Sequence, residues 1–344
     1  MKKIILCLML IVIILTGCGK KGENDVLEDF KNKVNNSNSY YLSGNMELVN
    51  NEDIYTYDIS VSYKKDNYYK IELVNSINNH KQIILRNDDG VYVVTPSLNK
   101  SFKFQSDWPY NNSQVYLLSS LLEDISNDKD RKYESNDKNN IFTSSVNYPN
   151  NEKLIKQKVY FNKSNLPEIV EVIDDEGVTQ IKMKFNKIDL KAEFNDTYFD
   201  LNSILNIEES NDNINEEPNK EKDVSKTQET ATIDDIIYPM YLPANTYLTN
   251  QEKVNTDNGE RLILTFTGDD SFVLVEETTK YSNKAEIIST YGDIELIGPS
   301  VAVINDNSAN WFANGIEYYM VSDTMKTPEL LKVAKSISVL PVSK

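Results

Sequence analysis

The chain has 344 residues, a formal net charge of −17, two cysteines and a single histidine. Phosphate groups are bound by basic surfaces, so this acidic balance argues against nucleic acid as a partner and against a charge-driven attachment to lipid headgroups. Cys7 lies in the N-terminal segment that is expected to be removed, so the mature chain keeps only Cys18 and cannot form an internal disulfide. A chain of this length must then be stabilised by packing, and two domains are expected.

The N-terminus carries the strongest pattern. Lys2 and Lys3 precede an uncharged apolar run over residues 4–15, which is typical of a secretory signal and too short for a comfortable membrane span. The segment Leu15-Thr16-Gly17-Cys18 resembles the lipobox of bacterial lipoproteins, in which the cysteine receives diacylglycerol and the chain is cut just before it. Residues 1–17 are therefore predicted to be a signal peptide and residues 18–24 a lipidated tether. The alternative is an ordinary cleaved signal with a chance cysteine.

Residues 25–205 are expected to form one β-rich domain. The segment Asp25–Val34 has apolar residues at helical spacing and predicts a short helix. From Tyr55 to Tyr63 every second residue is apolar or aromatic, which predicts a strand with one buried face. A second helix is expected with Ser113 as its N-cap. Further strands are predicted over residues 69–73, 81–86, 91–95, 102–104, 141–148, 154–161, 168–173 and 178–188.

Residues 206–233 are acidic and poor in apolar side chains, so they predict a flexible linker. Residues 234–344 are expected to form a smaller α+β domain, with Asn314-Gly315 as a tight turn. Its closing helix is predicted to take Thr327 as N-cap and Pro328 as its first residue. The strands of this domain are predicted over residues 261–266, 271–276, 293–297, 301–304, 310–313 and 316–321.

The residue inventory predicts no catalytic centre, no metal site and no cofactor. His80 is interpreted as a solvated surface residue, and one histidine does not make a typical zinc site when the only mature thiol, Cys18, is acylated. Carboxylates are plentiful, so a carboxylate-dependent cell-wall hydrolase stays an alternative. The acidic clusters fall at turns or in the linker, where turn chemistry and solubility explain them.

Large apolar side chains remain as candidates for binding. A curved antiparallel meander can hold an acyl chain or a partner's extended segment on its concave face. Ordinary core packing is the alternative for the same residues. The candidate ligand-binding residues are Tyr55, Tyr57, Tyr63, Phe102, Phe104, Trp108, Met183 and Phe185.

The order of motifs from about Asp25 to Leu201 resembles the LolA/LppX/RseB-like lipoprotein superfamily. The resemblance rests on the early helix, the segment Asp88–Pro96, the helix after Ser113 and the closing segments Val159–Asn162, Asn165–Pro167 and Asn195–Phe199. It implies an unclosed antiparallel β-barrel with helices across its opening, which binds acyl chains or protein segments.

The C-terminal part is similar to the small domain of two-domain sporulation and germination lipoproteins of spore-forming Firmicutes. Leu242-Pro243, Trp311 before Asn314-Gly315-Ile316, and the helix from Glu329 to Ile337 carry this likeness. The first domain is also similar to the germination-specific lipoprotein, and that resemblance implies a cell-wall or cortex amidase as a partner.

The sequence thus predicts a non-enzymatic lipoprotein on the outer face of the cytoplasmic membrane, acting in envelope, sporulation or germination processes. It would bind a partner protein or a lipid, with strand addition at an exposed edge as one mechanism. A lipid or lipoprotein carrier, or an envelope sensor, is the alternative. Such a carrier predicts a continuous apolar cavity.

Overall fold

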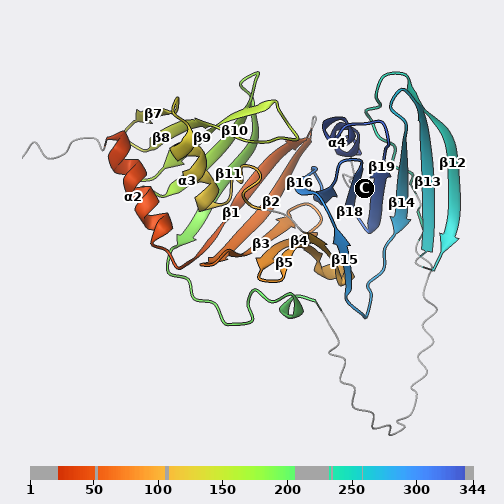
Figure 1. Ribbon diagram of the computed structural model, residues 1–344, viewed down its shortest axis with the longest axis horizontal. Coiled ribbons are helices and arrows are strands. Elements are labelled where there is room, and N and C mark those ends of the chain that lie inside the picture. Colours follow the sequence, from red (N-terminus) through yellow and green to blue (C-terminus); the bar gives the residue numbers. More distant parts are fainter. Residues whose placement is uncertain are drawn as a thin grey trace, which may run out of the picture.

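The computed structural model describes residues 22–50, 53–104, 108–205, 232–233, 235–257 and 259–337. The predicted signal peptide, Cys18 and nearly all of the predicted linker lie outside these residues. The described chain is mostly β-structure, in one sheet of twelve strands and one of seven, with three α-helices (Figure 1).

The larger sheet has the linear strand order β15-β6-β5-β4-β3-β2-β1-β11-β10-β9-β8-β7, so it is open. All its neighbouring strands are antiparallel except β15 and β6. The strands are β1 (Ser39–Asn50), β2 (Asp53–Lys64), β3 (Tyr68–Asn75), β4 (Lys81–Asn87), β5 (Gly90–Thr95), β6 (Lys100–Phe104), β7 (Lys132–Ser135), β8 (Asn140–Ser145), β9 (Leu154–Phe161), β10 (Pro167–Asp174), β11 (Thr179–Asp189) and β15 (Glu286–Thr290). An unclosed antiparallel sheet was the predicted architecture of this region.

Two helices cover one face of the larger sheet (Figure 1). Helix α2 (Glu23–Asn35) buries Val26, Leu27, Phe30 and Val34, as the helical spacing predicts. Helix α3 (Leu118–Asn127) begins five residues after the predicted cap, so the prediction for Ser113 was wrong. Ser113 instead accepts a hydrogen bond from the Asn147 backbone and donates one to Asp124, which joins a loop to the side of the helix.

The smaller sheet has the order β12-β13-β14-β19-β18-β17-β16. Its strands are β12 (Thr246–Thr256), β13 (Gly259–Gly268), β14 (Phe272–Thr278), β16 (Asp293–Leu296), β17 (Val301–Ile304), β18 (Ser308–Ala313) and β19 (Ile316–Val321). Asn314 and Gly315 both have positive φ, which confirms the predicted tight turn. Helix α4 (Thr327–Lys335) packs on this sheet, but its N-cap is Lys326 rather than Thr327.

The two predicted domains contribute to one sheet and one hydrophobic core across the predicted boundary. Strand β15 follows β14 in the chain, yet it pairs with β6 at the edge of the larger sheet. Ile294, Val301, Val303 and Phe312 belong to the hydrophobic core of the larger sheet, whereas Trp311 and Tyr318 belong to that of the smaller sheet. The C-terminal part is therefore joined closely to the first, and the division at residues 206–233 stays a prediction.

Candidate functional site

The eight predicted binding residues all lie in the core of the larger sheet. Seven are buried, and Tyr63 packs against them while half-buried. Tyr63 and Trp108 are linked through the ring of Tyr69, with ring centroids 5.0 and 5.8 Å apart. Phe102 instead stacks at 5.9 Å on Phe312 from the C-terminal part. The structure thus places the eight in one core, and their role as ligand contacts stays a prediction.

A hairpin formed by β16 and β17 lies against this core and is fixed by buried polar contacts. Gln82 of β4 donates its amide to the Val301 carbonyl at 3.2 Å and accepts from the Val301 N–H at 2.7 Å and from Ser300 Oγ at 2.9 Å. The Tyr57 hydroxyl donates to the Gly298 carbonyl at the tip of the hairpin. The predicted concave face is therefore occupied by the chain's own C-terminal part.

Gly298 shows how closely this hairpin fits. Its φ is +88°, and a Cβ atom there would lie 2.6 Å from Asn50 Nδ2 and 2.9 Å from Tyr55 Cε2. A larger residue would be strained in its backbone and would collide with the strands of the first sheet. The fit of the hairpin on the larger sheet therefore depends on glycine at position 298 and on Asn50 and Tyr55 in the facing strands.

One cavity of about 90 Å³ remains beside the hairpin. Its lining includes Met46 and Leu48 of β1, Tyr116 and the two charged residues Glu295 and Lys335. None of the eight predicted binding residues lines it. Burial raises the pKa of Glu295 and lowers the pKa of Lys335. The opposite charge of each partner, and the hydrogen bond from Asn150 to Glu295, act in the other direction and favour the ionised forms.

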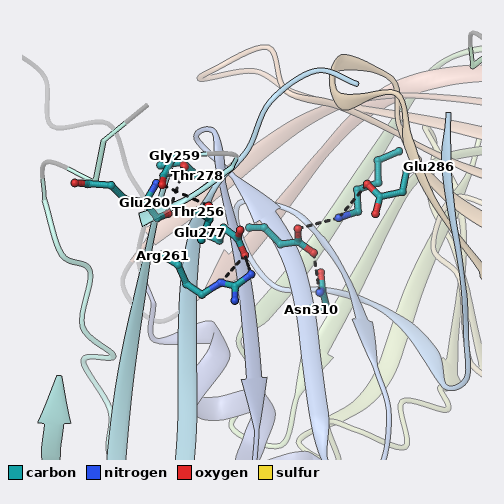
Figure 2. A network of polar contacts seen from close by, with 10 residues as sticks. Thr256, Gly259, Glu260, Arg261, Glu277, Thr278, Glu286 and Asn310 are labelled. Atoms are coloured by element: carbon teal, nitrogen blue, oxygen red, sulfur yellow. Dashed lines mark hydrogen bonds and ion pairs between the residues drawn. The ribbon is translucent and has the colours of Figure 1, made fainter. Parts of the chain in front are cut away.

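A second polar network joins the two sheets at β6 (Figure 2). Lys100 Nζ lies 2.9 Å from Glu317 Oε2 and 3.7 Å from Glu286 Oε2, and only 13% of the lysine side chain is exposed. Asn310 donates to the other oxygen of Glu317 at 3.0 Å. Sequence analysis missed this network, because its members are ordinary polar and charged residues of β6, β15, β18 and β19, which meet only where the two sheets lie against each other.

Glu276 is a carboxyl group buried within the smaller sheet. It is 1% exposed, and its Oε1 atom has no hydrogen-bond partner among the described residues. The same holds for the hydroxyl of Tyr318 and the indole nitrogen of Trp311, which lie in register on the next two strands. Burial raises the pKa of Glu276 to about 7, although a hydrogen bond from the Ile237 backbone acts in the opposite direction.

This raised pKa predicts a pH-dependent stability. From about pH 4.5 to 7 the unfolded chain loses the Glu276 proton while the folded chain keeps it, so the free energy of unfolding should fall as pH rises. The loss should approach about 3 kcal/mol at neutral pH. In urea titrations at several pH values, Glu276→Gln should remove this part of the slope, whereas Glu252→Gln on the exposed strand β12 should retain it. An unchanged slope in Glu276→Gln would contradict the assignment.

Two further sequence interpretations bear on chemistry. His80 is half-buried rather than solvated, and burial lowers its pKa. Within the described ranges, no group of three or more His, Cys, Asp or Glu side chains could hold a metal ion. None of the helices described is long and apolar enough to cross a bilayer.

The four sheet edges differ greatly in length. Strands β7, β15 and β16 have four, five and four residues, whereas β12 has eleven. Nine consecutive residues of β12 are exposed, with Tyr247, Leu248 and Val254 among them. An edge strand presents unpaired backbone N–H and C=O groups to another chain, and short edges limit such pairing. Strand β12 is thus the edge best able to receive an added strand.

Comparisons with known proteins give a family and several structural likenesses. The family described as "Sporulation protein YdcC-like" matches residues 1–199. Sporulation protein YdcC of Bacillus subtilis (strain 168) is 31% identical over 330 residues, which cover 96% of this chain and 94% of that protein.

Among solved structures, the MucA/MucB complex of Pseudomonas aeruginosa matches with 12% identity and a TM-score of 0.32, covering 90% of this chain and 97% of that chain. A LolA superfamily protein from Nitrosomonas europaea matches with 12% identity and a TM-score of 0.30, covering 54% of this chain and 100% of that chain. The CwlD amidase from Clostridioides difficile in complex with the GerS lipoprotein matches with 18% identity and a TM-score of 0.23, covering 52% and 98%.

Proposed function

Because the chain belongs to the family of YdcC-like sporulation proteins, we propose that it is a non-enzymatic binding protein that acts in sporulation and recognises a partner protein. We further propose that it is held on the outer face of the cytoplasmic membrane by lipid on Cys18. The support for the anchor is the N-terminal sequence pattern alone, since Cys18 lies outside the described residues.

The closed inner face is the observation that carries the choice of a protein partner over a lipid. A cavity of ~150 Å³ lined by apolar side chains holds a molecule of benzene, and the cavity beside the hairpin measures about 90 Å³. It also has Glu295 and Lys335 in its wall. An acyl chain would have to displace the hairpin that Gln82 holds. The lipid carrier therefore ranks second.

The proposed partner surface is the open edge of β12. An extended segment of the partner would add to this strand by backbone hydrogen bonds, and the exposed side chains of Tyr247 and Val254 would contribute to recognition. A cell-wall amidase is the first partner to test, because the sequence resemblance to the germination-specific lipoprotein implies one.

Absence of catalysis is part of the same proposal. The two carboxyl groups with a pKa of about 7 are Asp124 and Glu276, and they lie on α3 beside the larger sheet and on β14 within the smaller one. A glycoside hydrolase needs two carboxyl groups that flank one bond. Asp124 on α3 and Glu276 on β14 line no common pocket among the described residues, so they do not form such a pair with each other.

The first test compares the full chain with its Cys18→Ser and Cys7→Ser variants in sporulating cells. We expect the parent chain and Cys7→Ser in the membrane fraction, and Cys18→Ser in the extracytoplasmic soluble fraction. Mass spectrometry of organic extracts of folded, purified Cys18→Ser should find no stoichiometric lipid. Stoichiometric lipid in that sample would instead favour the carrier function.

The same cells test the edge strand. Chemical cross-linking should give a discrete product with one partner, and Tyr247→Lys with Val254→Lys should abolish it, because charges on an edge oppose strand addition. Ile54→Lys, at another exposed apolar position, is the matched control and should leave the product unchanged. A cross-link that survives the β12 variant would exclude this surface.

A further inference from the structure

A pocket of about 300 Å³ lies beside α3, away from the sheet core, and is called here the α3 pocket. One wall is the polar face of α3, where Ser119, Glu123 and Asn127 follow one another at a spacing of four residues. That spacing places them on one side of the helix. The opposite stripe of Leu118, Leu121 and Ile125 is buried. The other walls come from residues 109–110, 112–113 and 145–147.

The chemistry of the wall excludes several ligand classes. Among the described residues that line the α3 pocket there is no lysine, arginine or histidine, so phosphate and other anions lack a counter-charge. No described cluster of acids has the arrangement of a metal site. Apart from Pro109, Val146 and the ring of Tyr110, every lining residue is a serine, asparagine, aspartate or glutamate, so an acyl chain would meet polar groups on nearly all sides.

Some polar side chains that line the α3 pocket are held by hydrogen bonds within the protein, and others are exposed to solvent. Asp124 accepts from Ser113 and from Gln157, and Asp128 accepts the backbone N–H groups of Ser145 and Asp130. These contacts hold the floor of the pocket in one geometry. By contrast, Glu123 and Asn127 also line the pocket but are exposed, so their polar groups are solvated and available to a ligand.

Tyr110 supplies a half-exposed aromatic ring to the same pocket. Its hydroxyl donates to Asn67, and the Arg86 guanidinium lies 5.5 Å from its ring centroid. These two contacts fix the ring. Sugar rings present a face of C–H groups that packs on aromatic rings, while their hydroxyl and acetamide groups pair with carboxylates, amides and serines.

We propose that the α3 pocket binds an uncharged saccharide through Glu123, Asn127 and the ring of Tyr110. The size of the pocket, about 300 Å³, is at the lower limit of small-molecule sites and suits one or two sugar units. The proposed role is binding alone: the Asp124 and Asp128 carboxyl groups accept the hydrogen bonds described above and shape the wall. It is separate from β12, so it does not depend on the proposed protein partner.

The test measures binding of chitotetraose and of cellotetraose to the full chain in its Cys18→Ser form by NMR or calorimetry. Both sugars are uncharged, and only the first has acetamide groups. We expect saturable binding of at least one of them, with inorganic phosphate giving none. Glu123→Gln and Asn127→Ala should each weaken the affinity about tenfold, the factor that corresponds to one lost hydrogen bond.

Matched controls are Glu176→Gln in the exposed turn after β10 and Asn24→Ala on the exposed side of α2, which should bind as tightly as the parent chain. Circular dichroism and thermal unfolding check that each variant is folded. Failure of the parent chain to bind either sugar, binding of phosphate, or equal affinity in the pocket variants and the parent would overturn the proposal.

Discussion

Replacement of Phe161 by alanine is expected to lower the free energy of unfolding by about 3–5 kcal/mol, the range measured for large aromatic residues in protein cores. Phe161 ends β9 and is fully buried. Its ring packs edge-on against Phe30 of α2, with centroids 4.9 Å apart, and against Phe142 of β8 at 5.6 Å. The substitution would leave a void where the first helix meets the sheet.

Urea unfolding followed by tryptophan fluorescence measures this effect. The matched control is Ile155→Ala on the same strand, because Ile155 is 43% exposed. Exposed substitutions usually change stability by about 0.5 kcal/mol or less. A similar loss in both variants would show that the α2 contact contributes little beyond the strand itself.

Gln82→Ala is expected to destabilise the chain by about 2–3 kcal/mol, because it removes the side-chain partner of the buried Val301 N–H and leaves the Val301 carbonyl with only the 3.3 Å hydrogen bond from Ser300 Oγ. Gln82 is 3% exposed and is the only described side chain that bonds both groups. The hydrogen bonds that the substitution removes are those between β4 and the β16–β17 hairpin. That hairpin should then open before the rest of the chain unfolds.

Hydrogen exchange read by mass spectrometry resolves this order. Peptides that contain residues 297–304 should lose protection in Gln82→Ala while peptides of β9 and β10 keep theirs. Asn78→Ala is the control, since Asn78 also bonds across to the C-terminal part, at Asn314, but from an exposed position. Uniform loss of protection would mean that the hairpin and the sheet unfold as one unit.

The local patterns of the sequence predicted much of the fold. Alternation from Tyr55 to Tyr63 identified β2, and the Asn314-Gly315 pair identified the turn between β18 and β19. The resemblance to sporulation proteins is confirmed by the family match, and lipid attachment stays a prediction. The helix caps failed at Ser113 and Thr327, because a hydroxyl that could cap a helix can also bond elsewhere, as Ser113 does to Asp124.

Other elements had no local signal. Strand β12 has nine consecutive exposed residues and therefore no apolar alternation. Strand β15 has no buried residue, and its place is set by parallel pairing with β6, which no short window of sequence contains. Both assignments depend on contacts between distant segments.

The candidate site was harder to predict for a related reason. Aromatic residues on one face of a curved sheet have the same pattern whether they line a cavity or pack a core. The outcome depends on what covers them, and here the covering residues include Val301 and Phe312 from the other end of the chain. The α3 pocket did leave a trace in the sequence, since Ser119-Ser120, Glu123-Asp124 and Asn127-Asp128 recur every fourth position.

The pairing of β15 with β6 also constrains the order in which the parts of the chain fold. Synthesis proceeds from the N-terminus, so β6 is made long before Glu286–Thr290, the segment that pairs with it. Until then the edge at β6 is bare, Lys100 lacks both of its carboxylate partners, and loop closure over this distance is slow. The incomplete chain therefore passes through a stage at which β6 can pair with foreign strands, and completion of the C-terminal part ends that exposure.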